Sequence, residues 1–468
     1  MLKFFRKLLV AALCSGFCAS IGHAETLREA VRFAVTTNPV AKASEAEMRA
    51  AAFELLLLER EYAPTVTLDG EVGWQRVDDP SNLSPEDNDD GKARNRIGLR
   101  AELVLFDGFR RSNLVYANAA RVDGSIFRLL DASETLALNA TEAYIDVYRH
   151  RVLREVAKRN VEKHEEIGQR VRDLVSGGRL PYSDELTIDD RIRSAKLTQL
   201  TVEQALRDAS ARYERIVGRP PSGGMSVPLA QAPQSLSALK TESVNNSYRV
   251  QFARTQIDQS RFQAEAILSD RLPRVSLNAG ISRDKNRNGV SGTRNDHNVG
   301  VGLRWTIYQG GRKAERNALA EQTSRAMAEQ RIAVREVNEL AARTWNAYTT
   351  NLERSQQLKE QLRINRLLVD VYQEEFEAAK RSLLDLLEIE RARFNVEFES
   401  VGADAGLAFS TYRTLATRSK LASHFGLAKS DIAFDANFQE RARLGPTTVF
   451  DTTIEPLTVE PVVLEPLQ

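Results

Sequence analysis

The sequence predicts an α+β membrane protein in which very long α-helices adjoin four short β-strands. Residues 86–180 and 274–445 contain none of the 14 prolines and are rich in helix-forming residues, which favours long helices. Four segments with alternating apolar and polar side chains predict the strands. A basic and then apolar N-terminus predicts that the chain is exported.

The first 24 residues are typical of a signal peptide. Three basic residues precede an apolar stretch over 8–21, and small residues lead to a cleavage site between Ala24 and Glu25. A single membrane anchor is the weaker alternative, because the apolar run is short and interrupted by serine and glycine. Cys14 and Cys18 both lie in this segment, so the rest of the chain has no thiol for a disulfide or a metal.

The composition argues against several classes of function. Lys and Arg number 65 against 64 Asp and Glu, and no basic stripe predicts a nucleic acid as partner. The five histidines are scattered, and no glycine-rich loop has the phosphate-binding pattern. We therefore expect a protein that is not an enzyme, with no catalytic residues, no cofactor and no metal site.

The longest predicted helix covers residues 111–175, where two glycines are the only weak points. At about 1.5 Å per residue, such a helix is about 100 Å long. Apolar side chains recur at steps of three and four residues in 138–152 and 334–352, which is typical of coiled-coil seams. The helices alone would also fit a soluble coiled coil or adaptor.

The predicted strands lie near 65–78, 94–106, 274–284 and 296–308. Each alternates apolar with polar side chains, which is the pattern of strands that face lipid on one side. A half-buried sheet in a soluble protein shows the same alternation, but four such segments beside very long helices in an exported chain favour the membrane. Four strands cannot close a barrel without leaving two open edges in lipid, so we expect the chain to form an oligomer.

The sequence repeats itself once. Residues 106–110 read FDGFR and residues 308–312 read YQGGR, while 61–72 resembles 270–281. The expected organisation is therefore a signal peptide (1–24), a first structural repeat (25–218), a linker (219–238), a second repeat (239–427) and a flexible C-terminal tail (428–468).

Several motifs in a fixed order carry a family resemblance over about residues 25–427. They are LREAVRFAVTTNPV at 27–40, an Ala-Pro entry to the first strand, LFDGFRR at 105–111 and WTIYQGGRK at 305–313. With these motifs the chain resembles the TolC family of outer-membrane efflux proteins. The resemblance implies a homotrimer with a 12-stranded β-barrel in the outer membrane, continuous with a long periplasmic α-helical barrel.

The same resemblance implies the outer-membrane exit duct of a tripartite export system in a Gram-negative cell. The expected partners are outer-membrane lipid, a periplasmic adaptor (membrane fusion) protein and an inner-membrane transporter that is either ABC-type or proton-driven. The duct would serve type I protein secretion or drug efflux, and RSLLDLLEIE at 381–390 is more similar to the type I secretion branch. A periplasmic coiled-coil adaptor or scaffold protein is the alternative from another class.

The family places a pore gate at two helical turns, which match 176–186 and 378–390 here. Asp385 and Glu388 match its acidic positions, and their i, i+3 spacing puts both carboxylates on one helix face. Three copies around an axis would repel one another and attract cations. From the residues alone, an ordinary solvated acid near a helix N-terminus is the alternative.

Arg381 matches the basic residue that locks this gate in the family, with Ser183 and Asp184 at the partner positions on the facing hairpin. Phe376 stands where the family often has a tyrosine that helps the lock. Ser183 has a second interpretation, because it could N-cap the helix that follows Pro181. The two turns also resemble docking sites for adaptor tips, at Gly177, Gly178, Arg179, Leu180, Ala379, Lys380 and Ser382.

Overall fold

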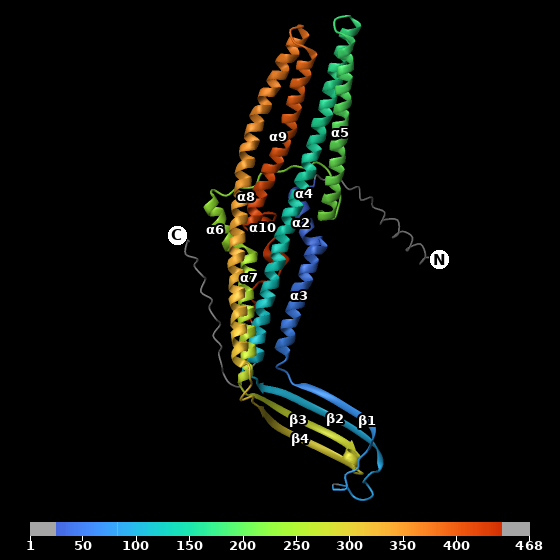
Figure 1. The fold of residues 1–468 in the computed structure, drawn as a ribbon, viewed down its shortest axis with the longest axis vertical. Coiled ribbons are helices and arrows are strands. Elements are labelled where there is room, and N and C mark those ends of the chain that lie inside the picture. Colours follow the sequence, from blue (N-terminus) through green and yellow to red (C-terminus); the bar gives the residue numbers. More distant parts are fainter. Residues whose placement is uncertain (1–24, 82, 442–468) are drawn as a thin grey trace, which may run out of the picture. The chain divides into compact units, whose positions relative to one another are not determined.

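The computed structural model describes residues 25–81 and 83–441, so the predicted signal peptide and the tail beyond 441 lie outside the described residues. The chain forms two compact units, and Figure 1 labels the helices and strands that belong to them. Unit 1 consists of the chain up to Lys42 with Asp131–Ser247 and Val337–Ile432, and unit 2 consists of Ala43–Leu130, Tyr248–Glu336 and the chain from Ala433.

Two helical hairpins dominate unit 1. The first joins α4 (Arg110–Ser176, 67 residues) to α5 (Tyr182–Val217), and the second joins α8 (Arg312–Glu377, 66 residues) to α9 (Leu383–Thr417). The first parts of α4 and α8 belong to unit 2. The helix expected over 111–175 is confirmed, and it extends one residue further at each end.

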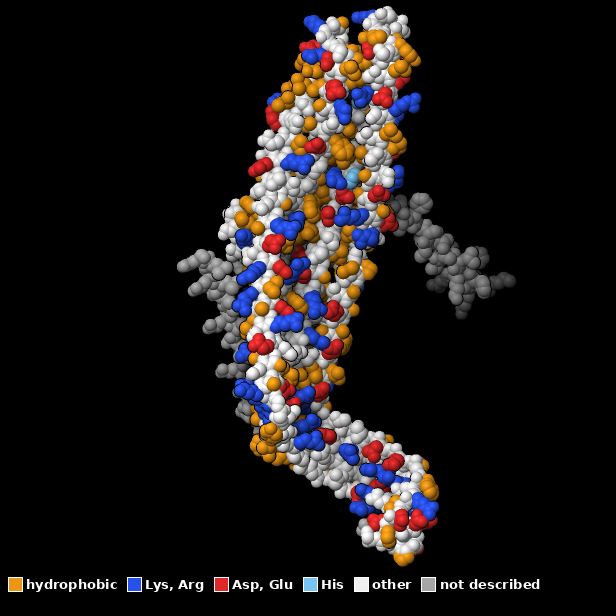
Figure 2. All heavy atoms as spheres, viewed as in Figure 1, with side chains coloured by type: hydrophobic (Ala, Val, Ile, Leu, Met, Phe, Trp, Pro, Cys, Tyr) orange, Lys and Arg blue, Asp and Glu red, His pale blue; other side chains and the backbone are white. Residues whose placement is uncertain are grey.

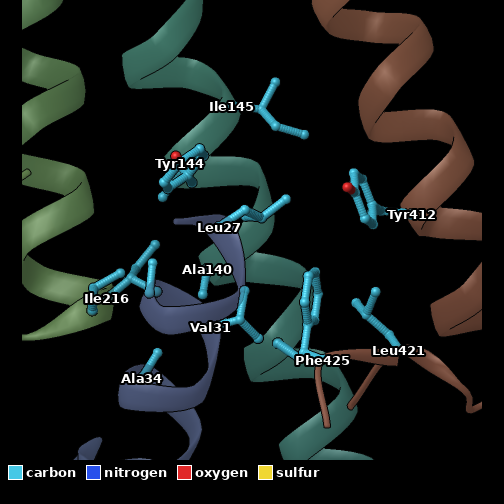
Figure 3. Packing of buried hydrophobic residues seen from close by; sticks show 14 of the residues in the cluster. Leu27, Val31, Ala34, Ala140, Tyr144, Ile145, Ile216, Tyr412, Leu421 and Phe425 are labelled. Carbon is cyan, nitrogen blue, oxygen red and sulfur yellow. The ribbon is translucent and has the colours of Figure 1, made fainter. Parts of the chain in front are cut away.

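The main core of unit 1 surrounds α2 (Leu27–Thr37), which begins with a capping box formed by Thr26 and Glu29. Buried apolar side chains of α2 belong to one cluster with side chains of α4, α5, α9 and α10 (Leu421–His424), as Figure 3 shows. Ala140 and Ala143 of α4 are fully buried in this cluster, as expected for small residues that allow close helix packing.

A buried carboxylate holds α10 (Leu421–His424) against α4. Glu134 is 6% exposed and accepts hydrogen bonds from the backbone N–H groups of Leu421 (3.0 Å) and Ala422 (3.2 Å). N–H groups in the first turn of a helix have no partner within that helix. Burial raises the pKa of Glu134 to about 7, while the two hydrogen bonds act in the opposite direction.

Unit 2 contains an antiparallel sheet with the strand order β1-β2-β3-β4. The strands are β1 (Thr65–Arg76), β2 (Gly91–Phe106), β3 (Arg274–Lys285) and β4 (Thr293–Arg304). The register places apolar side chains of neighbouring strands opposite one another, as in the pair Leu68 and Leu99. Val72 and Val299 on this face are 86% and 79% exposed, so the sheet presents an uncovered apolar surface.

The helices of unit 2 include α3 (Pro39–Arg60) and α7 (Tyr248–Leu268) beside the first part of α4. Tyr116 of α4 stacks on Phe262 of α7 with ring centroids 5.2 Å apart, and Arg128 of α4 donates to Glu47 of α3 over 2.5 Å. Figure 2 shows acidic and basic side chains interspersed along the long helices, with apolar side chains between them.

The described residues also form several short elements. They are α6 (Leu236–Asn246), η1 (Ser269–Arg271), η2 (Arg287–Gly289), α11 (Lys429–Ile432) and α12 (Phe438–Arg441). None of the helices in the described part of the chain combines the length and the apolar content needed to span a lipid bilayer.

The contact between Glu134 and α10 predicts a pH-dependent stability. Because the folded-state pKa is about 7 and the ordinary value is 4.5, folded protein keeps a proton at intermediate pH that unfolded protein has released. The free energy of unfolding should therefore fall as pH rises from about 4.5 to about 7, by up to about 3 kcal/mol from this group. Glu134→Gln should remove this component, which urea unfolding at a series of pH values would detect. An unchanged difference between pH 5 and pH 8 in the variant would contradict the assignment.

Candidate functional site

The two hairpin turns of unit 1 share one backbone pattern. In the α4–α5 turn, the N–H of Gly178 bonds the carbonyl three residues earlier (3.0 Å), and that of Arg179 bonds the carbonyl five residues earlier (2.8 Å). The same bonds, at 3.0 and 2.8 Å, start from Ala379 and Lys380 in the α8–α9 turn. Gly178 and Ala379 have positive φ values of 67° and 55°. Glycine tolerates this left-handed conformation that often ends a helix, whereas the Cβ of alanine is strained there.

The first turns of α5 and α9 differ from each other. α9 begins with a capping box, in which the Ser382 hydroxyl accepts from the N–H of Asp385 (3.2 Å) and the Ser382 N–H donates to Asp385 Oδ2 (3.4 Å). α5 begins after Pro181, and no side chain caps it. The N-capping role considered for Ser183 is therefore wrong, because Ser183 lies inside the first turn, where its carbonyl accepts from the Thr187 hydroxyl.

Asp385 and Glu388 lie one helical turn apart on α9, and both are exposed. The buried side of these turns consists of Leu383, Leu386 and Leu387. These leucines pack α9 against the neighbouring helices, so the carboxylates of Asp385 and Glu388 lie on the opposite, exposed side of α9. In the described chain, this acidic face is available to solvent or to another copy.

Arg381 forms a hydrogen-bonded ion pair with a residue of its own hairpin. Its Nε and Nη2 atoms lie 2.9 and 2.7 Å from Glu375 Oε2, and its guanidinium carbon lies 4.1 Å from the ring centroid of Tyr372. The hydrogen bond to Glu375 raises the pKa of the Arg381 guanidinium. Within the described chain, these two residues hold Arg381, and its ion pair and aromatic contact involve neither Ser183 nor Asp184.

Phe376 has a packing role in place of the gate role of a tyrosine. It is buried in a hydrophobic cluster that joins the two hairpins near their turns, together with Ile167 and Val171 of α4, Ile188 of α5 and the three buried leucines of α9. An ion pair between Arg170 Nη1 of α4 and Glu377 Oε1 of α8, at 2.7 Å, joins the hairpins on their surface. The aromatic partner of Arg381 is thus Tyr372, one turn before the expected position.

A cavity of about 430 Å³ lies between the two turns. Its lining includes the apolar side chains of Leu174, Leu180 and Phe376 and the side chains of Arg179 and Arg381. The expected docking positions surround this region: Leu180 is half-buried, whereas Gly177, Gly178, Arg179, Ala379, Lys380 and Ser382 are exposed. Asp173 and Glu377 also line the cavity, so the turns present an apolar recess with a polar rim that carries charges of both signs.

A second contact between the hairpins was not predicted from the sequence. Glu397 of α9 is 8% exposed, and its carboxylate lies 3.1 Å from Arg159 of α4, 2.9 Å from Arg393 of α9 and 3.5 Å from Arg366 of α8. Arg393 also donates to Glu390 over 2.9 Å. Buried carboxylates need such partners, and removing one is costly. The i, i+4 spacing of Arg393 and Glu397 is a local signal, but Arg159 is 238 residues away.

The sheet and the paired hairpins together fit one family of proteins. A family model described as outer membrane efflux protein matches residues 34–219 and 240–408. The chain belongs to this family. The resemblance seen in the sequence is thereby confirmed, and so are the outer-membrane location and the fold class, with four strands and long helices in each chain.

Curated relatives and solved structures extend the comparison. Outer membrane efflux protein BepC of Brucella suis is 24% identical over 433 residues, which cover 91% of this chain and 93% of BepC. Alkaline protease secretion protein AprF of Pseudomonas aeruginosa is 24% identical over 331 residues, which cover 66% of each protein. The Campylobacter jejuni CmeC outer membrane channel has a similar fold, with a TM-score of 0.72 at 14% identity and 89% of each chain covered.

The positive φ values of Gly178 and Ala379 predict that substitutions at these two positions have opposite effects on the stability of the turns. Ala379→Gly should stabilise the α8–α9 turn by up to about 1 kcal/mol, and Gly178→Ala should destabilise the α4–α5 turn by about 1–2 kcal/mol, because only the Cβ at a positive φ changes. A Cβ at Gly178 would meet no atom within 4 Å, so packing adds nothing to the effect. Hydrogen exchange of the turn amides measures both, with Gly177→Ala as control. Equal shifts from all three substitutions would contradict the strain argument.

Proposed function

We propose that the chain is one subunit of a homotrimeric exit duct whose barrel is closed by three copies of the four-stranded sheet. The observation that carries this proposal is the sheet itself. Among the described strands, β1 and β4 are each paired on one side only, and the apolar face is exposed. Unsatisfied backbone groups in lipid cost several kcal/mol each, so edge strands of neighbouring copies have to pair.

In this proposal the duct receives its cargo from an inner-membrane transporter through a periplasmic adaptor, and it moves that cargo without chemical change. The exposed turns of the two hairpins and the recess between them are the proposed docking surface. An apolar recess with a polar rim suits the tip of a partner's helical hairpin, whose apolar side chains enter the recess.

We further propose that the acidic face of α9 lines the inner mouth of the duct. Asp385 and Glu388, displayed by each copy around the axis, would attract cations there. Arg381 would hold the mouth closed by fixing the α8–α9 turn through Glu375 and Tyr372, which it contacts within the chain. Ser183 and Asp184 stay predicted members of the gate on the neighbouring hairpin.

For the cargo we propose a protein of the type I secretion kind, because 381–390 is similar to that branch and AprF is named for secretion of alkaline protease. Drug efflux is the alternative, and the name of BepC refers to efflux. Deleting the gene and comparing the secreted proteins with drug susceptibility distinguishes the two. Loss of a secreted protein at unchanged susceptibility supports the first.

A periplasmic coiled-coil adaptor or scaffold would also use long hairpins, but it would have no use for an exposed apolar sheet. The duct should be extracted from outer membranes only with detergent, run as a heat-modifiable trimer and form channels in planar bilayers. Release of the mature chain without detergent would favour the adaptor.

Neutralising the acidic face should change ion selectivity. The pair of substitutions Asp385→Asn and Glu388→Gln removes two negative charges from each copy, so cation selectivity in planar bilayers should fall. The helix start is kept, because the side-chain oxygen of an asparagine at this position can still accept from the Ser382 N–H. Ser382→Ala is the matched control, since it removes the cap hydroxyl and keeps both charges. Unchanged selectivity in the double variant would remove these residues from the pore.

Breaking the contact between Arg381 and Glu375 should favour the open duct. Glu375→Gln removes the charge that two guanidinium nitrogens of Arg381 contact, so single-channel conductance should rise. Glu374→Gln, on the neighbouring exposed position of α8, is the control and should leave the conductance as in the unmodified protein. A conductance that responds equally to both substitutions would mean that the pair does not hold the gate.

A further inference from the structure

The polar face of the sheet carries an excess of positive charge. The register and the alternation of side chains assign to this face every second residue, starting at Thr65 in β1, Lys92 in β2, Arg274 in β3 and Arg294 in β4. These positions hold seven basic and five acidic side chains, a net charge of +2 in each chain. The opposite face is the apolar surface described above.

All five acidic side chains of this face are close to an arginine. The separations are 3.5 Å between Arg94 and Glu71, 3.7 Å from Arg96 to both Asp69 and Asp284, 3.7 Å between Arg274 and Glu102, and 2.9 Å between Arg294 and Asp296. Lys92 contacts acidic residues of the preceding loop. Within the described chain, Arg100 and Arg304 are left with no carboxylate inside 4.0 Å, and both are exposed.

The position of Arg304 makes its lack of a carboxylate informative. It pairs directly with Arg274 across β3 and β4, at the end of the sheet where the strands continue into helices. Like charges directly opposite each other destabilise a sheet. A second basic residue at this place therefore adds nothing to the stability of one chain, and a carboxylate from outside the chain would offset the repulsion.

The surroundings leave both guanidinium groups accessible. Arg100 pairs with Gly280 of β3, and Gly302 and Gly300 precede Arg304 on the same face of β4. A Cβ at Gly300 would meet no atom within 4 Å, whereas polar side chains of β3 and β4 lie close to Gly280 and Gly302. Accessibility therefore rests on the exposure of the two arginines themselves. Arginine can bind a carboxylate with two parallel hydrogen bonds, and rings of basic side chains select anions in pores.

We propose that Arg100 and Arg304 bind carboxylate groups of the exported cargo as it passes the polar face of the sheet. The inference rests on the proposed function, in which this face lines the duct and each arginine occurs once in every copy. It makes acidic cargo the preferred class and assigns the basic barrel wall a role separate from that of the acidic inner mouth.

Current block by polyglutamate tests the proposal on the full-length protein in planar bilayers. The polymer is applied on each side of the bilayer in turn. In the proposed duct, polymer added on the side of the loops that join β1 to β2 and β3 to β4 reaches the sheet before it reaches the inner mouth. The variant Arg100→Gln with Arg304→Gln should need roughly tenfold more polyglutamate for half block, equivalent to about 1.4 kcal/mol. Arg283→Gln removes one positive charge from the apolar face and is the control. It should need the same polyglutamate concentration for half block as the unmodified protein.

The double substitution to lysine keeps the charge but cannot form two parallel hydrogen bonds with one carboxylate, so its half-block concentration should lie between those of the unmodified protein and the glutamine variant. Free glutamate, used in a parallel arm, shows whether a single carboxylate suffices or a polypeptide is required, and block by either source supports binding of carboxylates. Equal block of the unmodified protein and the glutamine variant, with both forming channels, overturns the proposal. If neither protein forms channels, the proposed function itself fails.

Discussion

The free edges of β1 and β4 each present a row of backbone N–H and C=O groups on one side of the sheet. Hydrocarbon offers no hydrogen bonds to such groups, while the apolar face of the same strands is suited to lipid. The two requirements are met together only when further strands complete the sheet. In the proposed trimer, the long helices that follow these strands would be arranged around the same axis, so the assembly of the hairpins would follow from the strand count.

Much of the fold could be predicted because its signals are local and repeated. Proline-free spans of helix formers gave α4 to within one residue at each end, and alternation located β3 at Arg274. The start of β2 was less accurate, since Gly91 and Lys92 precede the apolar alternation that marks the strand. Pairing with Gln75 and Arg76 of β1 extends β2 across these two residues, and this depends on a neighbour and not on their own pattern.

The contacts of the candidate site were less predictable, because they join residues across a turn or between helices. Arg381 reaches back over the α8–α9 turn to Glu375, which no helical spacing suggests. Glu397 has a partner on another helix, and only three-dimensional packing brings the two together. The Ser183 error has a simpler cause: Pro181, with its fixed φ, already occupies the cap position and shifts Ser183 into the helix.

The different helix starts at Pro181 and Ser382 limit the symmetry that a duplicated chain can have. Around a shared axis, the two hairpins of each copy would occupy similar positions, and three copies would give a ring with apparent sixfold order. Because one hairpin begins its second helix with reciprocal side-chain bonds and the other does not, alternate hairpins resist fraying unequally. Such a ring would have threefold and not sixfold symmetry in its local stability. At its inner end, every second hairpin could fray while the others stay folded.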